Sequence, residues 1–70
     1  MTNGEKLKEV IDESGVSITF LAGKLECSRN RIYAIINGAD CTASEIANLS
    51  KLLHMTRKQR DDIFLSMNVN

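Results

Sequence analysis

The sequence lacks proline and tryptophan, and only three of its 70 residues are aromatic. No stretch alternates apolar and polar residues for long enough to predict a strand. No apolar run approaches the length that would cross a bilayer. The N-terminal residues lack the basic, apolar and small-residue order of a signal peptide. We therefore expect a single cytoplasmic domain over residues 1–70, with no membrane association.

The chain is also poor in the residues that build catalytic and metal sites. It has one histidine, His54, no glycine-rich phosphate loop and no paired carboxylates in a plausible pocket. Cys27 and Cys41 do not form a metal-type pair, and with His54 they are too few for a zinc site. We expect two free, partly buried thiols, no metal, no cofactor and no enzymatic activity.

The net charge is zero, because nine basic residues balance nine acidic ones. This balance argues against a strong nucleic-acid binder, whose domain is usually basic. The charges are unevenly distributed, however. Between residues 17 and 38 the acid Glu26 stands against three basic residues, Lys24, Arg29 and Arg31. The compensating acids lie in the N-terminal segment, at Glu9, Asp12 and Glu13.

Start signals divide the chain into five predicted helices. Each helix is preceded by a serine or threonine that can cap its first N–H groups, and three of these residues have an acid or amide three positions later, the spacing of a capping box. The predicted caps are Thr2 with Glu5, Ser17, Ser28, Thr42 with Glu45, and Thr56 with Gln59. Gly15 and the pair Asn37-Gly38 are predicted stop signals.

Apolar residues recur at helical spacing after each start signal. The predicted core residues are Leu7, Val10, Ile11, Leu21, Ala22, Leu25, Ile32, Ile35, Ile36, Ile46, Leu49, Leu52, Leu53, Ile63, Phe64 and Met67. The connections are short, so we expect a compact all-α domain. Phe64 or Met67 can exceed what so small a core hides, which makes the last helix the predicted dimer contact.

The connection between the second and third helices is the most informative segment. Three residues, Glu26 to Ser28, separate two short helices, and a small residue, Ala22, lies in the first of them. This is the signature of a helix-turn-helix. Ala22 allows the two helices to cross closely. The residues after Ser28 project from the end of the helix that, in this motif, enters the DNA major groove.

Residues 17–38, SITFLAGKLECSRNRIYAIING, resemble the helix-turn-helix of the XRE family, which includes small phage Cro proteins and the DNA-binding domains of phage repressors. The matching residues are Leu21-Ala22, Leu25, Ser28, Ile32 and Asn37-Gly38. The order of five helices matches as well. The resemblance implies a five-helix lambda-repressor-like DNA-binding domain.

Two positions depart from the family pattern. Glu26 stands where the family often has a glycine in the turn, and a positive φ there costs a non-glycine residue roughly 1 kcal/mol. Ile18 stands where the family often has a glutamine that touches a phosphate. Thr19 or the backbone N–H groups at the start of that helix would have to serve instead.

Carried over by position, the family's base-reading residues fall on Ser28, Arg29, Asn30 and Ala34. Those that touch phosphates or the groove wall fall on Arg31, Tyr33 and Asn37. Arginine can pair with guanine and asparagine with adenine through two hydrogen bonds each. The alternative is that these residues form a solvated helix face with no partner.

The resemblance implies a Cro-like phage or prophage repressor that binds a double-stranded DNA operator as a homodimer, without a small-molecule effector. A second interpretation is a helix-turn-helix module that binds another protein, such as a repressor or a polymerase subunit, and does not read DNA. The neutral net charge and Glu26 favour this alternative. The basic cluster Arg57, Lys58 and Arg60 is followed by two aspartates, which indicates a mixed, solvated face.

Overall fold

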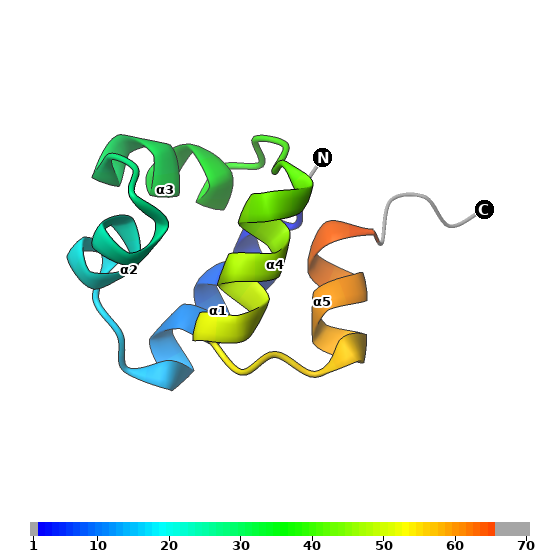
Figure 1. Cartoon of the computed structure of the whole chain (residues 1–70). Coiled ribbons are helices and arrows are strands. Elements are labelled where there is room, and N and C mark those ends of the chain that lie inside the picture. Colours follow the sequence, from blue (N-terminus) through cyan, green and yellow to red (C-terminus); the bar gives the residue numbers. More distant parts are fainter. Residues whose placement is uncertain (1, 66–70) are drawn as a thin grey trace.

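The computed structural model describes residues 2–65, and every regular element in that range is a helix (Figure 1). The predicted all-α architecture with five helices is confirmed. None of these helices is long and apolar enough to span a membrane. In chain order the helices are α1 (Gly4–Ser14), α2 (Ile18–Leu25), α3 (Arg29–Ile36), α4 (Ala43–Leu52) and α5 (Arg57–Phe64).

Side-chain caps start four helices as predicted. The hydroxyl oxygens of Ser17, Ser28, Thr42 and Thr56 each accept the backbone N–H three residues further on. Complete capping boxes are present at the starts of α4 and α5. Gly15 ends α1 in the left-handed conformation, with φ of 79°. The polar start signals in the sequence therefore set most of the helix boundaries.

The predicted capping box between Thr2 and Glu5 is wrong. Asn3 caps α1 instead, and its side-chain oxygen accepts the N–H of Lys6 at 3.2 Å. Thr2 is buried, and its hydroxyl donates to the sulfur of Cys41 at 3.8 Å. This contact with the segment after α3 takes Thr2 away from the helix start, so the next polar residue caps the helix.

Each helix contributes at least one fully buried apolar side chain to a single core. The largest of these are Leu7, Leu21, Ile32, Ile35, Leu49 and Ile63. Helix α1 packs against α3 and α5, and α2 packs against α3 and α4. The remaining predicted core residues of α2, α3 and α4 are buried or half-buried against this cluster. The predicted core residue Met67 lies outside the described residues.

The dimer contact predicted from Phe64 or Met67 is not tested at Met67, which lies outside the described residues, but Phe64 is confirmed as a core residue. Its side chain is only 7% exposed, because α5 packs against both α1 and α4. The exposed large apolar side chains within residues 2–65 lie elsewhere, at Phe20, Tyr33 and Leu65. Phe64 therefore belongs to the core of the domain.

The start of α1 is fixed against the ends of α3 and α5. A Cβ atom at Gly4 would overlap the backbone carbonyl of Ile36, the last residue of α3. The N–H of Asn3 donates to the carbonyl of Ile63 in α5 at 2.7 Å. The contact at Gly4 thus places the start of α1 directly against the C-terminal end of α3, and the hydrogen bond joins it to α5.

The basic cluster on α5 is a mixed charged face, as predicted. Lys58 lies 3.1 Å from Asp62, and Arg60 lies 3.8 Å from Asp61. These pairs are solvent-exposed and contribute little to stability.

Candidate nucleic-acid interface

The turn between α2 and α3 contains a residue in the left-handed conformation. Glu26 has φ of 56° and ψ of 45°. The N–H of Cys27 donates to the carbonyl of Ala22 at 3.0 Å, which closes the turn. A backbone of this kind usually carries glycine, so Glu26 occupies its position at some cost in conformational energy.

Helices α2 and α3 pack closely because a small side chain lies between them. Ala22 is only 4% exposed, and its neighbour Leu21 is fully buried. From α3, Ile32 and Ile35 fill the same core. The predicted crossing of a helix-turn-helix is therefore present, with the predicted residues at its centre.

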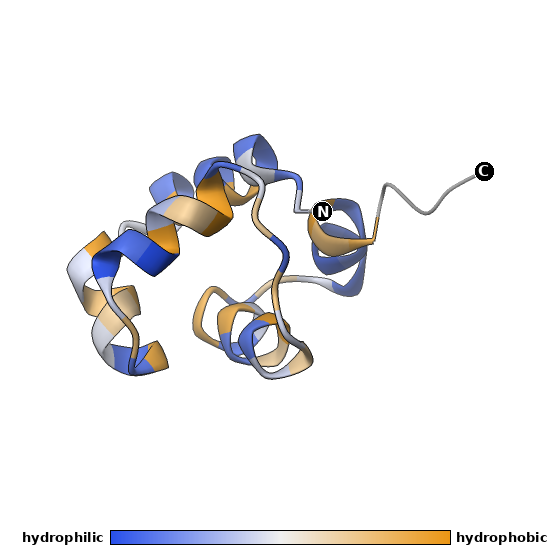
Figure 2. Ribbon diagram, turned by 90° about the horizontal axis from the view of Figure 1, so that it is seen from above, coloured by the Kyte–Doolittle hydropathy of each residue, from blue (hydrophilic) through white to orange (hydrophobic). Residues whose placement is uncertain are grey.

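Helix α3 lies on the outside of the bundle, above α2 and α4 in the view of Figure 1. Its first turn is hydrophilic and its second half is apolar (Figure 2). Ser28, Arg29 and Asn30 are exposed at this hydrophilic end. Within residues 2–65, the side chains of Arg29 and Asn30 form no hydrogen bond or ion pair. They are available to a partner outside the domain.

The other predicted contact residues lie further along α3, at its C-terminal cap and in the first turn of α2. Thr19, Tyr33 and Asn37 are exposed, whereas Ala34 is half-buried. Tyr33 lines an open cavity of about 290 Å³ that also borders the N-terminal residues of α2. The structure therefore places Tyr33 beside the start of α2, on a continuous surface with it.

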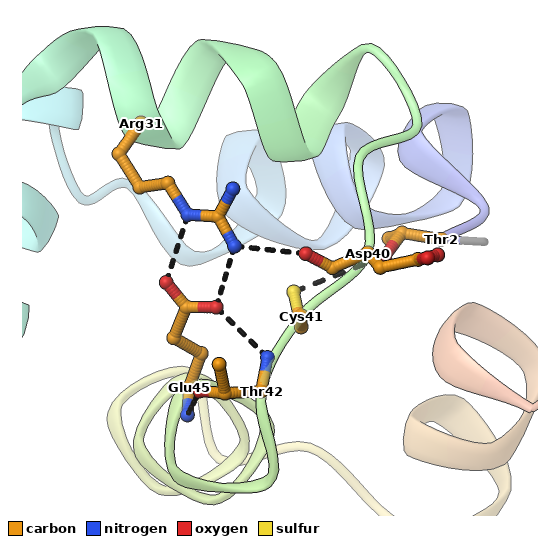
Figure 3. A network of polar contacts seen from close by, with 6 residues as sticks. All are labelled: Thr2, Arg31, Asp40, Cys41, Thr42 and Glu45. Atoms are coloured by element: carbon orange, nitrogen blue, oxygen red, sulfur yellow. Dashed lines mark hydrogen bonds and ion pairs between the residues drawn. The ribbon is translucent and has the colours of Figure 1, made fainter.

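Arg31 is placed differently from the other predicted contact residues, because its guanidinium group reaches α4 (Figure 3). Its Nε donates to Glu45 at 2.9 Å, and its Nη2 donates to the second oxygen of the same carboxylate at 2.7 Å. Nη2 also donates to the backbone carbonyl of Asp40 at 2.8 Å. Arg31 is therefore engaged within the domain, unlike Arg29.

The ion pair shifts the protonation of both partners toward their charged forms. Hydrogen bonds from Arg31 lower the pKa of Glu45 to about 2, with a smaller contribution from the backbone N–H of Thr42. The same pairing with Glu45 raises the pKa of Arg31. Both groups are thus charged at neutral pH, and the positive charge of Arg31 is compensated locally.

The sequence pattern does not indicate Glu45 as a partner of Arg31. The two residues are 14 positions apart and belong to different helices, so no local spacing connects them. Glu45 stood out only as the third residue of a capping box. Glu45 also completes the predicted capping box, because its carboxylate accepts the N–H of Thr42 at 2.9 Å.

The two cysteines are free and half-buried, as predicted. Burial raises the pKa of the Cys41 thiol, so it remains protonated at neutral pH. No group of three or more histidine, cysteine, aspartate or glutamate side chains that could hold a metal ion occurs in the range 2–65.

A closely packed α2, a three-residue turn and an outer α3 with a polar first turn define a helix-turn-helix protein. The family model of the Cro/C1-type HTH DNA-binding domain matches residues 6–59, from α1 into α5, and the chain belongs to this family. This is a family of DNA-binding regulators rather than enzymes. No curated protein and no solved structure matches the chain significantly.

Proposed function

We propose that this protein is a Cro-like phage or prophage repressor that binds double-stranded DNA in a sequence-specific manner. The observation that carries the proposal is that Arg29 and Asn30 are exposed at the start of α3 and that their side chains pair with no other residue in the range 2–65. In a helix-turn-helix, this end of the second helix enters the major groove. By binding across a promoter, the protein would exclude RNA polymerase.

Base reading is assigned to four residues of α3 and its cap. Arg29 has the geometry to donate two hydrogen bonds to guanine, and Asn30 can pair in the same way with adenine. Ala34 would contact a thymine methyl group, and Ser28 would contact a base edge or a sugar at the groove margin. This set carries the sequence preference of the proposal.

Phosphate contacts are assigned to Thr19 in α2, to Tyr33 in α3 and to Asn37 at the C-terminal cap of α3. Thr19 and the first N–H groups of α2 would bind one phosphate, since the start of a helix favours an anion. Tyr33 lies on the same surface, and Asn37 follows at the end of α3. Ile18 cannot donate a hydrogen bond, so this site depends on Thr19 and the backbone.

We further propose a homodimer on a near-palindromic operator, because one domain of this size makes few base contacts. Its two copies of α3 would lie about 34 Å apart, one turn of DNA. No effector is required, since occupancy would follow the concentration of the protein. Sedimentation with a duplex of two half-sites should give a complex of two chains, and a single chain per duplex would contradict the dimer.

The competing function is a protein-interaction module. Its support is the zero net charge together with exposed Glu26 in the turn. A phosphate-bound complex loses affinity steeply as salt rises, because counterions are released on binding. A protein-interaction module would not bind DNA, so no affinity for DNA, and hence no dependence of that affinity on salt, would be measured.

The decisive experiment is selection of bound sequences from a pool of random duplex DNA with the purified chain. Enrichment of a short sequence, with affinity that falls as salt rises, is the expected result. If no sequence is enriched and binding is undetectable at low salt, the repressor proposal is wrong.

A further inference from the structure

A side-chain bridge joins α3 and α4, whose backbones do not approach each other closely although both helices contribute side chains to the same core. Helices α3 and α4 both pack against α2, but no Cα atom of α3 comes within 8 Å of a Cα atom of α4. Arg31 and Glu45 span this gap (Figure 3). The bridge begins in the first turn of α3, next to the exposed pair Arg29 and Asn30.

The geometry of the bridge restricts how far α3 can move. Two parallel hydrogen bonds between Arg31 and Glu45 fix the plane of the guanidinium group, and the bond to the carbonyl of Asp40 adds a third anchor on the segment between the helices. Bidentate pairs of this kind are directional as well as strong. The Glu45 side chain is itself held by the N–H of Thr42, at the fixed start of α4.

The charge of the bridge also argues against a phosphate contact by Arg31. The carboxylate of Glu45 lies within 2.7 Å of the guanidinium, and its low pKa keeps it ionised. A DNA phosphate that approached this guanidinium closely would also approach an anion, which repels it. The exposed cation in this turn is instead Arg29.

We propose that Arg31 is a positioning residue, which with Glu45 sets the orientation of α3 on the domain so that Arg29 and Asn30 meet the correct base pairs. This role replaces the phosphate contact implied by the resemblance, and it rests on the proposed DNA-binding function. The bridge thus acts on specificity more than on general attraction to DNA.

The test compares Glu45→Gln, Arg31→Ala and the double variant on the selected duplex and on random duplex. Glutamine at position 45 can still accept the N–H of Thr42, so Glu45→Gln retains the capping box and removes only the ion pair. Thr42→Ala is the matched control, because it weakens the same helix start and leaves both charges in place.

We expect the ratio of affinities for selected over random duplex to fall roughly three- to thirtyfold in Glu45→Gln and in Arg31→Ala, with no further loss in the double variant. The ratio should stay unchanged in Thr42→Ala. The slope of affinity against salt should be the same for Arg31→Ala and the wild type. The proposal would be overturned if the salt slope of Arg31→Ala were reduced by about one phosphate contact. It would also be overturned if Glu45→Gln bound both duplexes more tightly while the ratio of affinities for selected over random duplex stayed unchanged.

The free protein supplies a second measurement that does not depend on DNA. Residual dipolar couplings of the backbone N–H groups report the orientation of α3 relative to α4. We expect this orientation to change in Glu45→Gln and not in Thr42→Ala, and an unchanged orientation in both would refute the positioning role. If the wild type selects no duplex while the couplings change as expected, only the proposed function fails.

Discussion

The backbone carbonyl of Ile36 occupies the space where a side chain of Gly4 would begin. We therefore expect Gly4→Ala to push α1 away from the end of α3 and to destabilise the fold by about 1–3 kcal/mol, measured by urea unfolding. Gly23→Ala is the control, because a Cβ atom there would meet no described atom beyond its chain neighbours and the nearby backbone of α2. It should stabilise α2 by roughly 0.5–1 kcal/mol, and equal effects of the two substitutions would contradict the close contact.

The crossing of α2 and α3 gives a second prediction about packing. Ala22 is buried between these helices, so Ala22→Leu should overpack the crossing and cost about 1–3 kcal/mol. Thermal unfolding monitored by circular dichroism measures the loss. A melting temperature equal to that of the wild type would be incompatible with the helix-turn-helix packing described above.

Glu26 gives a prediction with opposite sign. Its positive φ of 56° is unfavourable for glutamate, so Glu26→Gly should stabilise the protein by about 0.5–1 kcal/mol after the added entropy of the unfolded chain is included. Glu26→Gln retains the strained backbone and should leave stability unchanged. Both substitutions remove a negative charge from the turn and should raise DNA affinity to a similar extent. Stabilisation by glutamine as well would show that charge, not backbone strain, is responsible.

Local signals in the sequence were sufficient for much of the fold. Hydroxyl caps and apolar spacing located α2 to α5, and the small residue Ala22 located the crossing. The cap of α1 was misplaced because Thr2 is drawn to Cys41, a contact with a distant part of the chain. The sequence left open whether Phe64 is fully buried, because its burial depends on how α5 packs against α1 and α4. Pairings between helices have no signature in local spacing.

In the candidate site, too, the sequence indicates features that depend on local position and does not indicate those that depend on contacts between helices. Position within α3 was enough to identify Arg29 as an exposed residue at the start of the helix. The direction of the Arg31 side chain depends on Glu45, which reaches it only after α4 has folded against α2. Sequence position alone therefore could not show that Arg31 is bridged to Glu45 whereas Arg29 has no side-chain partner among residues 2–65.

The low pKa of Glu45 predicts a specific pH dependence of stability. Its folded-state pKa of about 2 lies below the ordinary value, so the ion pair stabilises the fold above the ordinary pKa and this contribution is lost as pH falls. The stability difference between the wild type and Glu45→Gln should be constant near neutral pH and shrink between about pH 5 and pH 2. Urea unfolding across this range measures it. Thr56→Ala, which removes a cap next to an uncharged Gln59, should show a difference that does not shrink in this way.

Arg29→Ala tests base reading directly. The substitution should cost about 1–3 kcal/mol on the selected duplex and relax the preference at one base pair, with a smaller loss on random duplex. Arg57→Ala makes the same charge change on α5, a helix that does not pack against α3, and should affect both duplexes little. Equal losses by Arg29→Ala on both duplexes would exclude a base contact.

The hydrogen bond from Asn3 to Ile63 connects the beginning of α1 with the last helix. Closing so long a loop costs only slightly more entropy than closing a shorter one, since the cost grows with the logarithm of loop length. The bond nevertheless requires α1 and α5 to pack together, and α3 packs against α1 with its last residue close to Gly4. We therefore expect two-state folding, in which no partly folded intermediate with α3 in a wrong orientation is populated.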